Sequence, residues 1–97
     1  MKKLLTIIIP LYNVEKYIRK CIESIIVPQK YYNDLEVIII NDGTPDNSAI
    51  IAKEYESKHP EFIKVINKEN GGHGSTWNLG LRMAQGKYIR FLDSDDW

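Results

Sequence analysis

Four short apolar runs, separated by stretches with a helical pattern, constrain the fold of this chain more than any other feature. The runs cover residues 4–9, 35–40, 62–66 and 88–92. The first two consist mostly of Ile, Leu and Val, which is typical of strands buried on both faces of a parallel sheet. Strand and helix patterns alternate along the chain, which implies right-handed crossovers between parallel strands and helices packed on the sheet.

The residues between the runs predict three helices. Apolar residues recur at spacings of three and four after Asn13, which can cap the first helix. The second helix is expected to start at Asp46 or Asn47, and the third at Ser75. Their expected ends lie just before Pro28, near Ser57 and near Ala84. The sequence therefore predicts an α/β fold of three layers, a Rossmann-like and mostly parallel sheet with helices on both faces.

Charge, length and cysteine content exclude several classes of protein. The 97 residues fit one domain, and 13 basic and 13 acidic side chains leave no overall positive field for nucleic acid. The single cysteine, Cys21, rules out an intrachain disulfide and lies on the apolar stripe of the first expected helix, so we interpret it as a core thiol. A chain without disulfides fits the cytoplasm. No run approaches the roughly 20 apolar residues that span a bilayer, so we expect no membrane span.

Polar residues follow all four expected strands. Ligands of open parallel sheets bind outside the carboxyl ends of the strands, and these ends share one edge. The polar groups at this edge are Tyr12 and Asn13, then Asn41, Asp42 and Gly43, then residues 70–74, and finally Asp93, Asp95 and Asp96. Solvent exposure alone gives no reason for such polar groups to follow all four strands at the same edge of the sheet. This pattern therefore favours a binding site at that edge.

The last strand runs directly into three carboxylates, Asp93, Asp95 and Asp96. Like charges this close repel one another, so folding alone gives little reason to gather them. A divalent cation that prefers oxygen ligands would provide one. A solvated acidic turn, or a helix N-terminus with acidic residues in its first turn, is the alternative interpretation.

Other nucleotide-binding folds match the sequence poorly. A dinucleotide fold needs G-x-G-x-x-G between the first strand and the first helix, where residues 10–13 contain no glycine. The G-x-G at residues 72–74 comes too late and lacks the third glycine, and no P-loop pattern is present. A phosphatase that forms an aspartyl phosphate would carry its D-x-D near the first strand.

Four motifs in a fixed order resemble the N-terminal half of a family 2 glycosyltransferase of GT-A fold. They are IIIPLYN at residues 7–13, EVIIINDGTPDNS at 36–48, ENGG at 69–72 and GKYIRFLDSDDW at 86–97. The resemblance covers essentially the whole chain. It implies that residues 1–97 are the N-terminal donor-binding part of a GT-A domain, truncated after the D-x-D motif.

The resemblance implies a sugar transfer that depends on a metal ion. Such enzymes move a sugar from a nucleotide-diphosphate donor, commonly a UDP-sugar, to an acceptor hydroxyl in glycan or cell-envelope polysaccharide synthesis. The family's D-x-D maps onto Asp93 to Asp95, and Asp95 is the expected ligand of Mn²⁺ or Mg²⁺. Asp96 is a second candidate ligand, while Asp93 would contact the ribose or a metal-bound water. The metal would stabilise the departing diphosphate.

The nucleobase is expected to lie against the loops after the first and second strands. In the family, the segment matching Pro10 to Tyr12 lines the base, and the residue matching Asp42 accepts a hydrogen bond from a uracil N–H. The chain departs from the family at residues 76–78, which read Thr-Trp-Asn where many members read Ala-Arg-Asn. It therefore lacks the arginine that many members place near the donor. Trp77 either packs in the core or stacks on the donor. His73 is either an ordinary loop histidine or a phosphate contact.

The family's general base and acceptor-binding region lie beyond the D-x-D motif. We therefore expect no catalytic residue within residues 1–97, and donor binding without turnover. A glycan or lipid-linked acceptor would bind through the missing part, and the resemblance suggests that such parent enzymes often act at the inner, cytoplasmic face of a membrane. A non-catalytic nucleotide- or metal-binding module is the alternative. An unpaired sheet edge could also pair two copies in a homodimer.

Overall fold

The computed structural model describes residues 3–12, 14–26, 34–68 and 72–92. Strands and helices alternate strictly, as the sequence pattern predicted. The elements are β1 (Lys3–Leu11), α1 (Ile18–Ile25), β2 (Leu35–Asn41), α2 (Ser48–Lys58), β3 (Ile63–Asn67), α3 (Gly72–Met83) and β4 (Gly86–Phe91). No helix in these ranges has both the length and the apolar character needed to cross a membrane.

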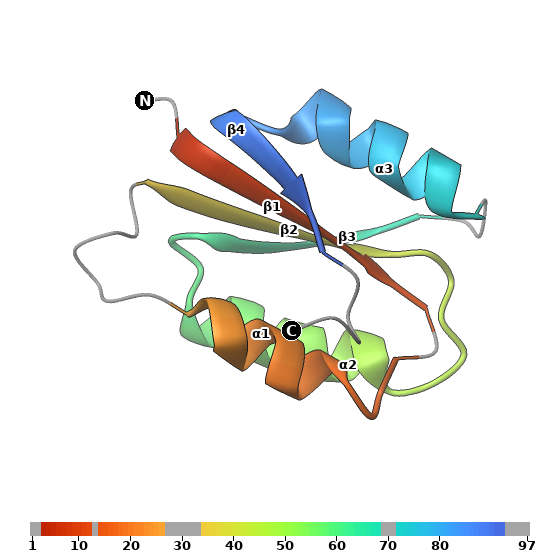
Figure 1. The fold of residues 1–97 in the computed structure, drawn as a ribbon. Helices are drawn as coiled ribbons and strands as arrows, with labels where there is room; N and C mark the ends of the chain where they lie inside the picture. Colours follow the sequence, from red (N-terminus) through yellow and green to blue (C-terminus); the bar gives the residue numbers. More distant parts are fainter. Residues whose placement is uncertain (1–2, 13, 27–33, 69–71, 93–97) are drawn as a thin grey trace.

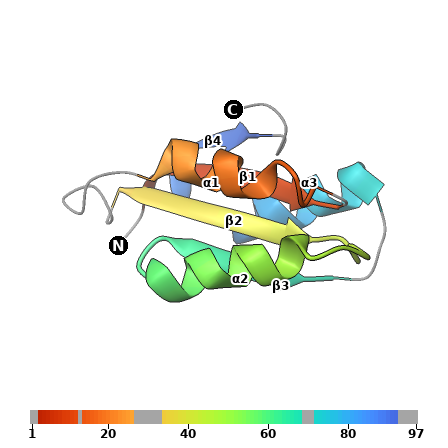
Figure 2. The ribbon, with the colours of Figure 1, turned by 90° about the horizontal axis from the view of Figure 1, so that it is seen from below.

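The four strands form one parallel sheet with the order β3-β2-β1-β4. Helices α1 and α2 cover one face, and α3 covers the other (Figure 1). From below, α1 and α2 lie side by side under the sheet (Figure 2). The predicted three-layer α/β fold, with a parallel sheet and helices on both faces, is therefore confirmed.

The direction of the chain across the sheet reverses once. From β1 it proceeds through β2 to β3, and it then returns to the far side of β1 to form β4. Ligands of such sheets bind at the carboxyl ends beside this reversal. Strand β4 pairs with β1 only as far as Ile8, opposite Phe91, whereas β1 and β2 stay paired to Leu11 and Asn41. The pairing of β4 with β1 thus ends three residues before the end of β1.

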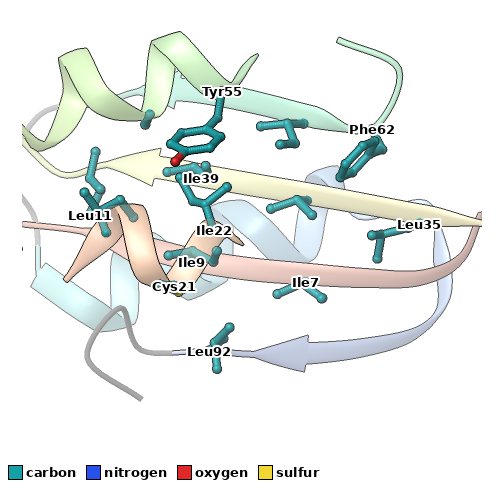
Figure 3. Close-up of a cluster of buried hydrophobic side chains, with 14 residues drawn as sticks. Ile7, Ile9, Leu11, Cys21, Ile22, Leu35, Ile39, Tyr55, Phe62 and Leu92 are labelled. Carbon is teal, nitrogen blue, oxygen red and sulfur yellow. The ribbon is translucent and has the colours of Figure 1, made fainter. Parts of the chain in front are cut away.

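The core has two parts because successive side chains of a strand point to opposite faces. On the side of α1 and α2, the larger cluster includes Ile7 and Ile9 of β1, Cys21 and Ile22 of α1 and Tyr55 of α2 (Figure 3). The alternate residues, Ile8, Ile38 and Ile40, pack with Trp77, Leu79 and Met83 of α3. The buried position of Cys21 confirms its interpretation as a core thiol.

Two boundaries differ from the sequence prediction. Helix α1 begins at Ile18 and not directly after Asn13, which lies outside the described residues. Residues 14–17 form a turn instead, in which the amides of Tyr17 and Ile18 both donate to the Val14 carbonyl at 2.9 Å. Helix α3 begins at Gly72, so Ser75 lies inside the helix and is not its cap.

Strand β4 is more exposed than its apolar sequence suggested. Tyr88, Ile89 and Phe91 are 59%, 40% and 39% exposed. We expected a parallel sheet covered by helices on both faces, and for the side chains of β4 this expectation is wrong. Among the described residues, β4 has a neighbouring strand on only one side.

Candidate functional site

The carboxyl ends of β1 and β2 place three of the predicted site residues together. Leu11 pairs with Asn41 in the sheet, and the Asp42 amide donates to the Leu11 carbonyl at 3.1 Å. Pro10 is buried in β1, and Asp42 is only 3% exposed. Tyr12 follows β1 with 42% of its surface exposed, so its ring is accessible at the edge beside Asp42.

The Asp42 carboxylate forms an ion pair with Lys68. Lys68 Nζ lies 2.6 Å from Asp42 Oδ1, and the two side chains are only 14% and 5% exposed. The backbone holds Lys68 in place, since its amide donates to the Asn41 carbonyl at 2.9 Å. The Asn41 amide group also donates to Asn67 Oδ1 at 3.0 Å across the same strand ends. A partly buried positive charge and a buried negative charge thus share the sheet edge.

Sequence reasoning did not identify Lys68 as a site residue. The available signal was its place directly after the third expected strand and directly before the ENGG motif. Neighbouring strands of a parallel sheet end at the same edge, so this position brings Lys68 close to the residues that follow β2.

Asp46 fastens the loop after β2 to the loop after β1. Its Oδ1 accepts hydrogen bonds from Thr44 Oγ1 at 2.6 Å and from the Ser48 amide at 3.0 Å, and also from Ser48 Oγ. Its Oδ2 accepts from the Glu15 amide at 3.0 Å. Asp46 therefore satisfies donors at the start of α2 and in the turn that precedes α1.

These hydrogen bonds change the acidity of Asp46. Partial burial acts to raise its pKa, because it penalises the charged form. The hydrogen bonds from Ser48, Thr44 and the Glu15 amide stabilise the carboxylate and together outweigh burial, so the pKa of Asp46 falls from 3.8 to about 2. Asp46 is consequently an anion at neutral pH, and the contact between the two loops depends on that charge.

Two further hydrogen bonds join the same loops. The Asn47 amide donates to Glu15 Oε1 at 3.2 Å, and the Val14 amide donates to Ser48 Oγ at 3.2 Å. In the tight turn after Asp42, Gly43 has a φ of +72°, a conformation that side-chain-bearing residues rarely adopt. The loops that carry Tyr12 and Asp42 are thus held together as one unit.

The three predicted carboxylates Asp93, Asp95 and Asp96 lie outside the described residues, as does residue 13. The structure does fix the residue that precedes them, because the Leu92 amide donates to the Ile8 carbonyl at 3.0 Å and Leu92 is 8% exposed. Between residues 3 and 92, the described parts contain no group of three His, Cys, Asp or Glu that could hold a metal ion.

Trp77 lies on the face of α3 that packs on the sheet. It contacts the cluster around Ile8, Ile38 and Ile40, and its ring centroid is 4.9 Å from that of Phe91. Of the two interpretations considered for Trp77, the geometry supports core packing. The side chain of His73 is outside the described part of the structure, so its role stays a prediction.

Known proteins with similar sequences include glycosyltransferases and a teichoic acid biosynthesis protein. The minor teichoic acid biosynthesis protein GgaB of Bacillus subtilis (strain 168) is 47% identical over 91 residues, which cover 94% of this chain and 10% of that protein. An uncharacterized glycosyltransferase of the same organism, EpsJ, is 45% identical over 97 residues, covering 100% of this chain and 27% of EpsJ. The chain thus spans only 10% of the length of GgaB and 27% of the length of EpsJ.

Solved structures show the same fold. S. aureus TarS 1-349, in complex with UDP-GlcNAc, matches 95% of this chain with a TM-score of 0.80 and 31% identity, and the match covers 26% of that chain. The mannosyltransferase PcManGT from Pyrobaculum calidifontis, in complex with GDP-Man and Mn²⁺, matches 98% of this chain and 28% of its own with a TM-score of 0.85. The TM-score of 0.85 shows that the two proteins share a fold, and at 23% identity the comparison with PcManGT shows the fold alone.

The motifs, the parallel sheet and the polar carboxyl edge agree with these similarities. The family described as glycosyl transferase family 2 matches residues 6–97, nearly the whole chain. The chain belongs to glycosyl transferase family 2.

Proposed function

We propose that the chain is the donor-binding part of a glycosyltransferase that moves a sugar from a nucleotide-diphosphate sugar, most simply a UDP-sugar, to an acceptor hydroxyl. The observation that carries this proposal is the joined edge of β1 and β2, where Tyr12 is accessible beside the buried carboxylate of Asp42. A complex of the similar TarS with UDP-GlcNAc supports a UDP-sugar as donor. The similarity to GgaB supports a role in cell-envelope polysaccharide synthesis.

In this proposal the two loops bind the nucleoside. Tyr12 offers an exposed aromatic face on which a base can stack, and Pro10 fixes the direction of the chain before it. Asp42 accepts a hydrogen bond from the base, while Asp93 contacts the ribose. The hydrogen bonds that Asp46 accepts from the Glu15 and Ser48 amides hold both loops in place. The surface that binds the base is therefore formed before the base binds.

The carboxylates after β4 fit a divalent metal site. Asp95 and Asp96 supply oxygen ligands, which Mg²⁺ and Mn²⁺ prefer, and they follow a strand end anchored beside the reversal point of the sheet. When bound, the ion supplies Lewis-acid stabilisation of the diphosphate leaving group. Asp95 is the proposed principal ligand.

The acceptor and the general base belong to sequence beyond residue 97 in this proposal. The described residues at the carboxyl edge include one buried carboxylate, Asp42, and it is already paired with Lys68. A general base has to reach the acceptor hydroxyl and take its proton. The chain by itself therefore binds the donor without transferring the sugar.

Calorimetric titration of the 97-residue chain with UDP, with and without Mn²⁺, tests this function. We expect binding that strengthens with Mn²⁺, and loss of the Mn²⁺-dependent part in the Asp95→Ala/Asp96→Ala double variant. Asp34→Ala/Glu61→Ala removes two exposed carboxylates elsewhere and serves as the matched control. If the folded chain binds UDP in neither condition, the donor-site assignment is wrong.

A further inference from the structure

Glu36 is a buried carboxylate that the proposed donor site does not use. It lies in β2 at the amino end of the sheet and is only 2% exposed. Its Oε1 accepts hydrogen bonds from Thr6 Oγ1 and from the Gln85 amide, both at 2.9 Å. The Thr6 hydroxyl in turn accepts from the Gly86 amide at 2.8 Å. These four residues, here called the Glu36 network, join β2 and β1 to the turn from which β4 starts (Figure 1).

Burial of the Glu36 carboxylate makes the network depend on the position of that turn. A buried carboxylate is costly unless hydrogen bonds and an opposite charge compensate for the lost water. The cation is Lys64, whose Nζ lies 3.8 Å from Glu36 Oε2 and whose side chain is 53% exposed. The hydrogen bonds to Oε1 come from Thr6 and Gln85. The carboxylate is therefore fully compensated only while the turn before β4 stays in place.

The side chains of β4 specify its position along β1 only weakly. Tyr88, Ile89 and Phe91 are 59%, 40% and 39% exposed, so the strand would lose little apolar burial if it shifted. The register of a strand is weakly specified where burial does not select one face. A shift by two residues keeps every side chain on its own face and moves the end of the strand by about 7 Å. Contacts other than apolar burial must therefore fix β4 along β1.

The start of β4 supplies such contacts. At Gly86 the chain approaches β1 so closely that a Cβ atom would lie 2.5 Å from the backbone nitrogen and the Oγ1 of Thr6. A shift by two residues would bring Ala84 or Tyr88 to this position, where a Cβ atom does not fit. The shift would also take the two donating amides away from their acceptors. The Glu36 network thus favours a single register of β4.

We propose that Glu36 is a positioning residue of the donor site, because the Glu36 network fixes the register of β4 and thereby the place of the metal-binding carboxylates. In this register the Leu92 amide donates to the Ile8 carbonyl at 3.0 Å, and Asp93 follows directly. The role of Glu36 rests on the proposed donor-binding function and adds to it a residue at the opposite end of the sheet. Glu36 acts through β4 and does not contact the nucleotide.

Native-state hydrogen exchange measures the register of β4 without any ligand. Glu36→Met nearly keeps the size of the side chain and removes both oxygen acceptors. We expect the protection of the Leu92 amide to fall at least about 10-fold. The Asp42 amide donates to the Leu11 carbonyl at the carboxyl ends of β1 and β2, so it is the internal reference and should keep its protection. Equal losses at the two amides would indicate general destabilisation and would overturn the proposal.

Calorimetric titration with UDP separates the metal site from the nucleoside site. In the proposed function the loops after β1 and β2 bind the nucleoside, and the Glu36 network does not hold these loops. With Mn²⁺, we expect Glu36→Met to weaken UDP binding at least about 10-fold, the usual cost of losing a residue that orients metal ligands. Without Mn²⁺, the affinity should change by less than about 3-fold, as for independent sites. Glu61→Met, at an exposed position before β3, is the control and should match wild type in both conditions.

Glu36→Gln is the conservative variant. Its side-chain oxygen can still accept both hydrogen bonds, and only the charge near the exposed Lys64 is lost. It should therefore retain the protection of Leu92 and the Mn²⁺-dependent binding, and losses as large as those of Glu36→Met would overturn the role of the hydrogen bonds. If circular dichroism shows that Glu36→Met does not fold, Thr6→Val takes its place with the same expectations, because it removes the hydroxyl that accepts from Gly86.

The possible outcomes distinguish the positioning role from the proposed function. A selective loss of Leu92 protection together with a selective loss of Mn²⁺-dependent binding in Glu36→Met supports the role of Glu36. If the wild-type chain binds UDP and the folded variant keeps the full Mn²⁺ dependence, the positioning role is wrong while the donor site stands. If the folded wild-type chain binds no UDP with or without Mn²⁺, the donor site is wrong and the positioning role falls with it.

Discussion

At the scale of single residues, Asp46 shows how one carboxylate can organise a binding edge that it does not form itself. It joins donors from three positions, Thr44, Ser48 and the Glu15 amide, and so connects the loop after β1 with the loop after β2. Tyr12 and Asp42 lie on these two loops. The geometry at the edge therefore depends on an acidic group that remains charged.

This dependence predicts a loss of stability in acid. The pKa of Asp46 is lowered from 3.8 to about 2 in the folded chain. Its contribution to the free energy of unfolding is thus complete above pH 3.8 and is lost as the pH falls through about 2. We expect Asp46→Asn to lower the free energy of unfolding by about 1–2 kcal/mol at neutral pH, because hydrogen bonds to the charged group are lost.

Urea unfolding followed by circular dichroism between neutral pH and pH 2 measures this effect. The difference between wild type and Asp46→Asn should shrink as the pH falls below 3.8. Asp34→Asn, at an exposed position before β2, is the control and should differ little from wild type at neutral pH. A difference that stays constant down to pH 2 would show that the charge of Asp46 does not stabilise the fold.

The residues of the site differ in how far the sequence could predict them. Pro10, Tyr12 and Asp42 were expected from motifs, and they come together because consecutive strands joined by a crossover helix are commonly neighbours. The contact of Lys68 with Asp42 spans 26 residues and depends on the register of β3 against β2. An apolar run specifies a strand but not its register, so this contact appears only in the structure.

At the scale of elements, a buried polar contact ties the turn before β4 to the two central strands. Thr6 Oγ1 donates to Glu36 Oε1 at 2.9 Å and accepts from the Gly86 amide at 2.8 Å. Glu36 Oε1 also accepts from the Gln85 amide at 2.9 Å. This contact lies at the amino end of the sheet, and it sets where β4 starts along β1.

Gly86→Ala should displace β4 from β1. A Cβ atom at Gly86 would lie 2.5 Å from the backbone nitrogen and the Oγ1 of Thr6, so the backbone itself has to move. We expect the free energy of unfolding to fall by about 1–3 kcal/mol, the usual cost of overpacking. Mn²⁺-dependent UDP binding should also weaken, because β4 leads directly to Asp93.

Thermal unfolding and the UDP titration measure the two effects. Lys87→Ala, at the exposed neighbouring position, is the control and should change stability by no more than about 0.5 kcal/mol. If Gly86→Ala is as stable as the control, the contact around Thr6 does not position β4.

The types and the order of the helices and strands could be predicted from the apolar pattern of the sequence, whereas the first residue of α1 could not. Val14 and Tyr17 fit the helical spacing, so the pattern extended the helix towards Asn13. In the structure, the amides of Val14 and Glu15 donate to Ser48 Oγ and Asp46 Oδ2. The neighbouring loop holds these residues in a turn, and a contact of that range has no local signature.

At the scale of the whole molecule, the strand order β3-β2-β1-β4 gives β4 a neighbouring strand on only one side within the described part of the chain. The apolar sequence could not reveal this, because hydrophobicity does not tell which strand lies at the edge. Exposed edge strands pair readily with other chains, and Tyr88, Ile89 and Phe91 are all more than a third exposed. We therefore propose that two copies of this chain associate through β4.

A lysine on the edge strand should prevent that association. Native proteins use edge lysines to block pairing, because extending the sheet would bury the charge. We expect sedimentation velocity to show a concentration-dependent dimer for wild type and a monomer for Ile89→Lys. Ile50→Lys introduces the same change at an isoleucine of α2 that is 61% exposed, and it should dimerise like wild type. A wild-type chain that stays monomeric at all concentrations tested would contradict pairing through β4, whereas loss of the dimer in both variants would place the interface elsewhere.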